Sequence, residues 1–549
     1  AADRDAARLA RARTGHRRAR IVRATDRRAR PEAEEREAAD VEDAAEVEAF
    51  VDRHAEIGAA PDVAAFEVHL EDERATFAER EELLVEAHEA GVAREHLIGA
   101  EEPIRELEGV AREPTVAREE TVVAVVPGEA RADRAREAVA EEARERRALE
   151  LREGRAAAVQ SSVLADRILA AVRDVLGPTN GVMPLHEPEF RGREREYLKD
   201  CIDTGWVSSV GAYVDRIETD LARITGVERA VAVANGTAAL HICLELVGVK
   251  PGDEVLIPDL TFVATANAVS YAGARPHFVD SEDVSLGVDA ARLEAHLAGV
   301  AGIRDGVCYN RTTGAPIRAL VVMHAFGHPC DLDAIEAVAL RWNLALVEDA
   351  AESLGSFYKG VHTGGRGRVA ALSFNGNKVV TTGGGGAILT NDPELGRRAK
   401  HLTTTARVPH RWNFIHDEIG YNYRMPNLNA ALGCAQLERL DDMLARKRDL
   451  ASRYAAAFEG VEGARFLAEP TGTRSNFWLN AIVLEDPDLV GRDRVLERLN
   501  DAGYMSRPIW TLMHRLPMYA DCPRADLTVA ERLEATVINL PSSPKLADA

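Results

Sequence analysis

The sequence predicts an α/β protein with a mostly parallel central sheet flanked by helices, followed by a smaller α+β C-terminal domain. Between residues 229 and 374, short apolar runs alternate with helix-like segments. This order is typical of parallel strands joined by right-handed crossovers. A long helix-like stretch from residue 425 to 449 precedes shorter mixed segments, which indicates a second domain from residue 431.

Composition divides the chain into three regions. Residues 1–162 are an extension rich in Ala, Arg and Glu, residues 163–430 are expected to form the large domain, and residues 431–549 the small one. The extension has few large apolar residues at helical spacing, although pieces such as 81–90 and 130–152 could be helical. It could be a disordered or partly helical appendage, an upstream reading frame fused by a wrong start, or a partner-binding domain.

Charge and cysteine content exclude several classes of function. The formal net charge of -22 argues against nucleic-acid binding, which needs a basic surface. Six scattered cysteines without a CxxC pair fit a reducing compartment, and no metal is expected, because Gly and Pro interrupt the His324/His328 pair. No apolar run reaches the roughly 20 residues of a membrane span, so we expect a cytoplasmic protein without a membrane partner.

A strand-to-helix turn offers a place for a phosphate group. The apolar run 229–234 leads through Asn235-Gly236-Thr237 into a helix-like segment. The free amides of a helix N-terminus favour anions, and the Thr237 hydroxyl can add a hydrogen bond. The alternative is an ordinary Asn-Gly turn without a ligand.

Two ionisable residues lie where a cofactor could use them. Asp349 ends an apolar run, where an unpaired carboxylate would be costly unless a cation such as a pyridinium faced it. Lys378 stands before four consecutive glycines in SFNGNKVVTTGGGG, and a lysine can form an imine. Asp349 could instead be a helix N-cap, and Lys378 could instead be an ordinary surface lysine. Lysine, acid and phosphate turn together are the parts that a pyridoxal phosphate (PLP) enzyme needs.

The positions of these residues along the chain suggest one site. Asn235, Phe262, His324, Asp349 and Lys378 each follow an apolar run. The carboxyl ends of parallel strands share one edge of a sheet, so these residues are expected to meet there. Phe262 could stack on a cofactor ring or belong to the core, and His324 is predicted to face the substrate.

Four motifs together resemble the DegT/DnrJ-type sugar-nucleotide aminotransferases, over roughly Leu164 to Pro544. The motifs are Asn235-Gly236-Thr237, Glu348-Asp349-Ala350-Ala351, Ser373 with Lys378, and Gly420-Tyr421-Asn422-Tyr423-Arg424. The resemblance implies the type I PLP-dependent aminotransferase fold. It makes Lys378 the catalytic imine lysine and Asp349 the partner of the pyridine nitrogen, while Thr237, Ser373 and Gly236 would hold the phosphate.

The same resemblance implies roles for five further residues. Phe262 matches the ring-stacking position, and Glu352 stands beside the cofactor where many members carry Gln or His. Asn422 matches a residue that reaches the neighbouring subunit's phosphate, which implies a homodimer. The resemblance places the segment around Arg507 near the nucleotide sugar, so Arg507 and Arg424 are candidates to bind its diphosphate.

Four segments are similar to a LegC-like subgroup. They are PLHEPEF, WVSSVGAYVDRIE, FNGNKVVTTGGGG and RPIWTLMHRLPMY. The likeness implies amination of UDP-4-keto-6-deoxy-N-acetylglucosamine with glutamate, toward nonulosonic acids or surface polysaccharide. Perosamine-forming enzymes, which use a GDP-4-keto-6-deoxymannose, share much of this pattern. A PLP-dependent dehydratase and a non-catalytic paralogue are the remaining alternatives, and the intact lysine argues against both.

Overall fold

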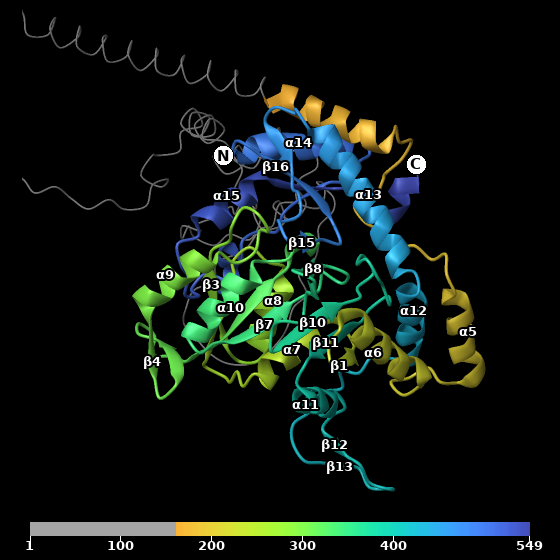
Figure 1. The fold of residues 1–549 in the computed structure, drawn as a ribbon, viewed down its shortest axis with the longest axis vertical. Helices are drawn as coiled ribbons and strands as arrows, with labels where there is room; N and C mark the ends of the chain where they lie inside the picture. The colour runs from red at the N-terminus through yellow and green to blue at the C-terminus, as the bar shows by residue number, and fades with distance from the viewer. Residues whose placement is uncertain (1–160, 549) are drawn as a thin grey trace, which may run out of the picture. The chain divides into compact units, whose positions relative to one another are not determined.

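A seven-stranded sheet lies at the centre of residues 161–548, which the computed structural model describes (Figure 1). Its strand order is β1-β11-β10-β7-β6-β2-β3. All strands except β11 run parallel, because β11 pairs antiparallel with both β1 and β10. The strands are β1 (Arg229–Val233), β2 (Glu254–Pro258), β3 (Arg275–Val279), β6 (Ile317–Met323), β7 (Ala345–Asp349), β10 (Val369–Ser373) and β11 (Gly386–Thr390).

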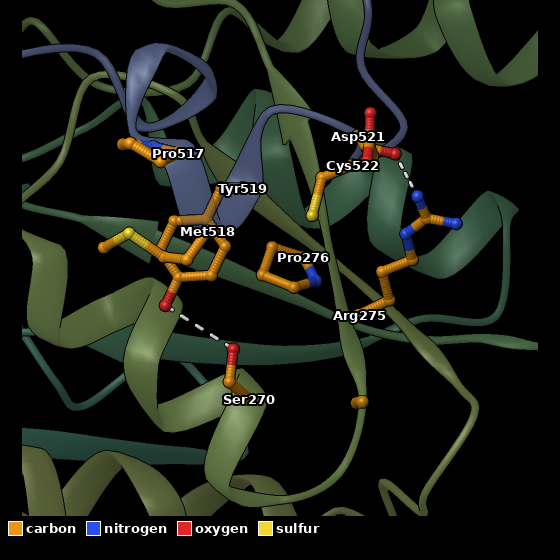
Figure 2. Close-up of a pocket in the computed structure, with 9 residues that line it drawn as sticks. Ser270, Arg275, Pro276, Pro517, Met518, Tyr519, Asp521 and Cys522 are labelled. Carbon is orange, nitrogen blue, oxygen red and sulfur yellow. Dashed lines mark hydrogen bonds between the residues drawn. The ribbon is translucent and has the colours of Figure 1, made fainter. Parts of the chain in front are cut away.

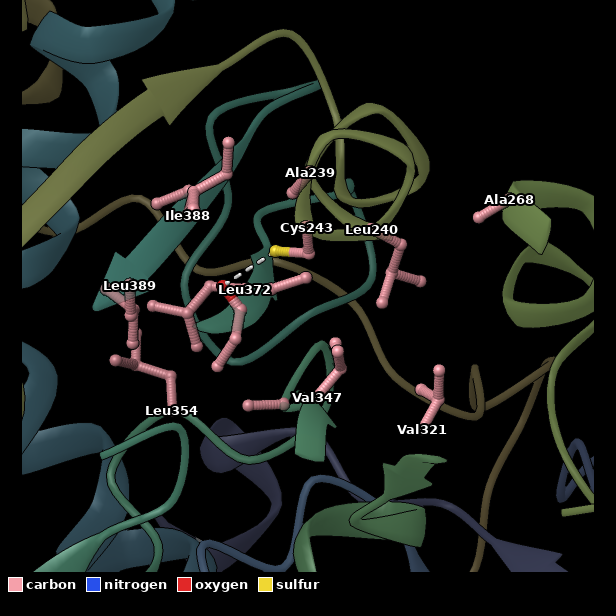
Figure 3. Packing of buried hydrophobic residues seen from close by; sticks show 14 of the residues in the cluster. Ala239, Leu240, Cys243, Ala268, Val321, Val347, Leu354, Leu372, Ile388 and Leu389 are labelled. Carbon is pink, nitrogen blue, oxygen red and sulfur yellow. Dashed lines mark hydrogen bonds between the residues drawn. The ribbon is translucent and has the colours of Figure 1, made fainter. Parts of the chain in front are cut away.

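The two faces of this sheet belong to different hydrophobic cores, because successive strand residues point to opposite sides. Val321 and Val347 pack into one core, whereas Leu320 and Leu346 pack into the other. Figure 3 shows the first core, where Cys243 of a covering helix lies over Leu372 of β10. Its thiol donates to the Ala370 carbonyl, 3.4 Å away. Helices therefore cover both faces of the sheet, as predicted.

Each face has its own set of helices. The first core takes residues from α7 (Gly236–Leu246), α8 (Val263–Tyr271), α11 (Pro393–Thr403) and α12 (Asn427–Leu437), and α12 also packs on α5 (Glu194–Thr204) and α6 (Ala212–Thr225). The opposite core takes residues from α9 (Ala290–Val300) and α10 (Leu332–Arg341).

Several of these helices begin at a side chain that accepts a hydrogen bond from the first turn. At the start of α7, Asn235 Oδ1 accepts from the Ala238 amide at 2.8 Å. Aspartates do the same for α9, α10, α11 and a later helix, α14 (Leu489–Asp501): Asp289, Asp331, Asp392 and Asp488. These caps fix where the chain turns from strand or loop into helix.

A four-stranded antiparallel sheet follows in the last part of the chain. Its order is β14 (Ala464–Phe466), β16 (Asn480–Leu484), β18 (Val537–Leu540) and β17 (Arg507–Pro508). The helices beside it are 161–176, α13 (Leu440–Phe458), α14 and α15 (Thr528–Thr536). Ile482 and Leu484 of β16 pack with these helices, whereas Ala481 and Val483 pack toward the first core.

Short strands form three further pairings around the main sheet. They are β4 (Ala301–Arg304) with β5 (Val307–Asn310), β8 (Phe357–Tyr358) with β9 (Val361–His362) and β15 (Thr473–Arg474), and β12 (Arg407–Val408) with β13 (Ile415–His416). The β12–β13 hairpin projects away from the sheet (Figure 1).

Two segments differ from their sequence predictions. The stretch predicted as one helix from residue 425 to 449 is divided into α12 and α13 at Glu438 and Arg439. Strand β11, which follows the glycine run, is reversed, so the lysine-bearing loop joins two neighbouring antiparallel strands.

The predicted extension, including the candidate helices 81–90 and 130–152, lies outside the described residues except for 161 and 162. Those two residues open the helix 161–176. Within 161–548, the helices are too short or too polar to span a bilayer.

Candidate active site

Lys378 and Glu352 form a buried ion pair at the edge of the central sheet. Lys378 lies on the loop between β10 and β11, and its Nζ donates to Glu352 Oε1 at 3.1 Å. The other carboxylate oxygen, Oε2, accepts from the Phe326 amide at 2.8 Å. Burial raises the pKa of the Glu352 carboxyl, while the Lys378 ammonium and the Phe326 amide act against that rise. The lysine is thus enclosed and facing an acid, unlike a surface lysine.

Trp478 adds a second contact to Lys378 that the sequence did not reveal. Lys378 Nζ lies 3.5 Å from the centroid of the indole ring. The indole Nε1 donates to the Asn377 carbonyl at 2.6 Å, one residue before the lysine. Trp478 stands just before β16, far from Lys378 in sequence, and a Trp before a buried strand gives no local signal of such a contact.

Asp349 is a buried carboxylate with neutral hydrogen-bond partners. It is the last residue of β7, and its Oδ2 accepts from the Thr265 hydroxyl at 2.7 Å. Its Oδ1 accepts from the Ala351 amide at 3.2 Å, within a turn rather than a helix. Burial raises the pKa of Asp349, and hydrogen bonds from Thr265 and Ala351 and the charge of Lys378 oppose the rise. Among residues 161–548 no Lys or Arg forms an ion pair with Asp349.

Gly236 and Ser373 form a tight cradle at the N-terminus of α7. A Cβ atom added to Gly236 would lie 2.9 Å from the Ser373 Cβ, closer than side chains approach. One added to Gly386 would lie 2.6 Å from the Asn235 carbonyl carbon. Thr237 follows Gly236 in the first turn and is half-buried. These glycines allow the helix N-terminus and the end of β10 to meet, which leaves backbone amides for an anion.

Phe262 is linked to the buried Asp349 through the first turn of α8. It precedes α8 and is 49% exposed, so it is not a core residue. Its carbonyl accepts from the Thr265 amide at 3.1 Å, and the Thr265 hydroxyl binds Asp349. The Phe262 backbone therefore lies near the Thr265–Asp349 hydrogen bond, and an exposed aromatic ring in this segment could stack on a flat cofactor.

The residue types at this edge fit PLP. Lys378 supplies an amine, and the charge of its ammonium opposes the rise in the pKa of Asp349. Asp349 is a buried acid without a cationic partner, as a protonated pyridine nitrogen would require. The Gly236–Ser373 cradle at the α7 N-terminus suits a phosphate.

His324 differs from its predicted role. The ring is fully buried, and Nε2 donates to Glu348 Oε2 at 2.9 Å. Nδ1 accepts from the Cys330 amide at 3.2 Å, which leaves no ring nitrogen for a substrate. Glu348 also accepts from the Gly364 amide at 2.7 Å, so the buried His324–Glu348 pair stabilises the chain around the end of β7.

The remaining predicted residues lie at the surface or partly buried. Asn422 is exposed, and Arg424 forms a β-bridge with Val233 at the end of β1. The Arg424 Nε is buried without a hydrogen-bond partner. Arg507 is exposed, and its guanidinium donates to the Ser506 carbonyl at 3.1 Å.

A shallow cavity of about 250 Å³ lies away from these residues (Figure 2). Its walls come from the end of α8, the start of β3 and the segment 517–522. Ser270 donates to the Tyr519 hydroxyl at 3.5 Å, and Arg275 donates to the Asp521 carbonyl. It contains none of the predicted site residues, so it is not the candidate active site.

Comparison with known proteins shows the family of this chain. A model described as the DegT/DnrJ/EryC1/StrS aminotransferase family matches residues 188–549. The chain is 36% identical over 366 residues to a GDP-perosamine synthase of Escherichia coli O157:H7, covering 67% of this chain and 94% of that protein. It is 39% identical over 366 residues to a GDP-perosamine synthase of Caulobacter vibrioides, covering 66% and 93%.

A solved structure shares the fold. The aminotransferase TlmJ from Streptoalloteichus hindustanus superposes with a TM-score of 0.59 at 31% identity, covering 66% of this chain and 94% of that one. The predicted α/β fold with a mostly parallel sheet is therefore confirmed. The chain belongs to the DegT/DnrJ/EryC1/StrS aminotransferase family and is a PLP-dependent sugar aminotransferase.

Proposed function

We propose that the protein transfers an amino group from glutamate to the keto carbon of a nucleotide-linked 4-keto-6-deoxy sugar, with PLP held by Lys378. The observation that carries this proposal is the enclosed amine of Lys378 beside the unpaired buried carboxylate of Asp349. When bound, PLP supplies an electron sink that accepts the amino group from the donor and passes it to the sugar.

Asp349 and Lys378 are proposed to have different acid–base roles. The Asp349 carboxylate would face the ring nitrogen and keep it protonated, since its other partners are a hydroxyl and an amide. Lys378 Nζ would be the base that moves the proton from Cα of the amino donor to the cofactor carbon. Glu352 Oε1 lies 3.1 Å from that Nζ and would contact the O3′ side of the ring.

The cofactor phosphate would bind at the N-terminus of α7. Thr237 and Ser373 offer hydroxyl groups there, and Gly236 lets the backbone approach. Phe262 would cover one face of the ring. The helix dipole adds a favourable interaction with the dianion.

Two sugar nucleotides are candidate substrates. The segment likeness to the LegC-like subgroup favours UDP-4-keto-6-deoxy-N-acetylglucosamine, whereas the names of the two curated relatives favour GDP-4-keto-6-deoxymannose. Arg424 supports either proposal, because its buried Nε has no partner and a diphosphate could supply one. Arg507 is exposed and can serve the same group.

The active unit is proposed to be a homodimer. Asn422 is exposed, as a residue that reaches a neighbouring subunit must be. Exposed apolar side chains lie next to it around the β12–β13 hairpin, and such patches mark protein interfaces. They are Trp412, Phe414, Ile415 and Ile419. We place the reaction in the cytoplasm, because the six cysteines are all free thiols.

The decisive experiment measures amino transfer in wild type and in Lys378→Ala. Protein is incubated with PLP, ¹⁵N-labelled glutamate and a set of UDP- and GDP-4-ketosugars, and products are identified by mass. We expect a labelled aminosugar from wild type and none from Lys378→Ala, which also loses the visible band of the bound cofactor. Lys199→Ala, an exposed lysine, is the control and keeps both.

The outcomes separate the alternatives. Turnover by Lys378→Ala would contradict the role of this lysine. A dehydrated product without ¹⁵N would favour a dehydratase, and a folded protein that binds no PLP would favour a non-catalytic paralogue. Which nucleotide supports turnover decides between the two substrates.

A further inference from the structure

The loop that carries Lys378 is held at two points by one indole ring. The Trp478 ring centroid lies 3.5 Å from Lys378 Nζ, and Trp478 Nε1 donates to the Asn377 carbonyl at 2.6 Å. The first contact acts on the charged end of the lysine and the second on the backbone beside it. A cation over an aromatic face is attracted by the negative centre of the ring.

Asn476 joins this indole to the acid on the other side of the lysine. Its Oδ1 accepts from the Trp478 amide at 2.8 Å, and its Nδ2 donates to the Glu352 carbonyl at 2.9 Å. Phe477, which lies between Asn476 and Trp478 in the sequence, has φ 47°, a left-handed conformation that a bulky residue rarely adopts. Such strain persists only where surrounding contacts impose it, and it is common at functional sites.

A buried lysine holds the same turn from behind. Lys447 of α13 is fully buried, and its Nζ donates to the Trp478 carbonyl at 3.1 Å and the Ser542 carbonyl at 2.6 Å. The Trp478 backbone is thus held on both sides, by Asn476 at its amide and by Lys447 at its carbonyl. The indole is therefore a rigid platform, and its place over Lys378 is set by three separate parts of the chain.

We propose that Trp478 is a positioning residue for Lys378. Its ring face and the Glu352 carboxylate together form the resting place of the lysine ammonium when the amine is not bonded to the cofactor. This inference rests on the proposed function of Lys378, but its geometry is a property of the protein alone. Trp478 lies on the loop before β16 of the four-stranded sheet, whereas the rest of the proposed site is built on the central sheet.

The test measures how fast Lys378 reacts in cofactor-free protein. Acetic anhydride modifies only the neutral amine, and peptide mass analysis reports the rate at Lys378 and at the exposed Lys199. Fluorinated tryptophans at position 478 weaken the negative ring face with little change of volume. Trp478→Met removes the ring, and Trp342→Phe, on the distant α10 helix end, is the control.

We expect the Lys378 rate to rise with each added fluorine and to rise roughly 3- to 30-fold in Trp478→Met, relative to Lys199. Trp342→Phe should leave the ratio unchanged. Melting curves confirm that each variant is folded, and the fluorine series carries the test if Trp478→Met does not fold.

A Lys378 rate independent of fluorine number would overturn the proposal. So would an equal rise at Lys378 and Lys199, which would indicate general loosening. Neither result depends on amino transfer: if wild type fails to aminate any sugar while the fluorine series behaves as expected, the proposed function fails and the positioning role stands.

Discussion

Two buried acids near Lys378 have different partners and therefore different tasks. Glu352 faces the ammonium at 3.1 Å, whereas Asp349 meets only a hydroxyl and an amide. Burial raises the pKa of both carboxyls. The acid without a cation is the one that gains most from a cationic ring nitrogen, because a buried charge is costly until it is paired.

Replacing Asp349 by Asn should weaken the site without unfolding it. Asn keeps the shape and can still accept from Thr265, but it cannot stabilise a protonated ring nitrogen. We expect PLP affinity to fall about 10- to 100-fold, the effect of losing a charge-assisted hydrogen bond. Amino transfer should fall further.

Titration of the visible band checks the change in affinity. The melting temperature without cofactor should stay level or rise, since a buried charge has been removed. Unchanged affinity would contradict the proposed partner of Asp349.

Single residues divide into those that sequence could identify and those that it could not. Asp349 and Lys378 could be singled out because each follows an apolar strand and carries a charge. Trp478 could not, because its contact with Lys378 spans most of the fold and leaves no periodic signal. His324 was wrongly assigned to the substrate, because sequence does not show that Glu348 and the Cys330 amide use both ring nitrogens.

At the scale of elements, the junction of α7 with β10 and β11 depends on missing side chains. Gly236 approaches Ser373 so closely that a Cβ atom would clash at 2.9 Å. The cradle is therefore set by the strand pairing Ser373–Gly386 and by the cap at Asn235. A change in the geometry of the Gly236–Ser373 cradle would therefore also move the backbone amides that are proposed to bind an anion.

Gly236→Ala should impair cofactor binding more than stability. The added methyl group must push Ser373 away, which displaces a proposed phosphate ligand. We expect PLP affinity to fall at least about tenfold, with a melting temperature lowered by only a few degrees. Equilibrium dialysis of PLP and thermal unfolding measure the two effects.

Gly299→Ala, in α9, is the matched control. A Cβ atom there meets nothing within 4 Å, and alanine is the better helix former. Equal losses in both variants would show that the cradle is not the cause.

Elements were easier to predict than their directions and ends. The main-sheet strands could be predicted, because apolar runs alternate with helix-like segments, whereas the short strands β4, β5, β8 and β9 were not predicted; the main-sheet strands in question are β1, β2, β3, β6, β7 and β10. The reversal of β11 could not, since the glycine run permits either direction. The break between α12 and α13 was missed because Glu438 and Arg439 are good helix formers.

At the scale of the whole molecule, buried imidazoles link folding to pH. Burial lowers the pKa of His328 and of His362 to about 4, below the ordinary value of about 6.5. His362 Nε2 accepts from the Gly355 amide at 2.7 Å, which only the neutral ring can do. These rings stay neutral in the folded protein where the unfolded chain would bind protons.

The contribution of these two rings to stability should therefore fall as pH decreases from about 6.5 toward 4. In this window the unfolded state binds more protons, and each ring contributes a slope of up to about 1.4 kcal/mol per pH unit. Above pH 6.5 the contribution is complete and constant. Urea unfolding at pH 7.5, 6.0 and 5.0 measures the slope.

His328→Gln should reduce this pH dependence relative to wild type. The Gln variant carries no titrating group at that position, so its unfolding free energy should change less between pH 6.5 and 5.0. Parallel curves for the two proteins would contradict the assignment.

Mixed dimers test whether each active site draws on two subunits. Lys378→Ala and Asn422→Ala proteins should each be weak or inactive alone. After unfolding and refolding together, about a quarter of wild-type amino transfer should return, because half the dimers are mixed and each has one intact site. Activity that stays at the level of the separate variants would contradict a shared site.

Lys378 is also earlier in the chain than Trp478 and Lys447, whereas Glu352 precedes it. On the ribosome, the lysine loop emerges before Trp478, and both emerge before Ser542, to which Lys447 is bonded. A growing chain can pair β7 with β10, and Lys378 with Glu352, before the Trp478 indole covers the amine. Each new molecule is thus expected to bind the PLP aldehyde in its working orientation only after the final strands have been translated.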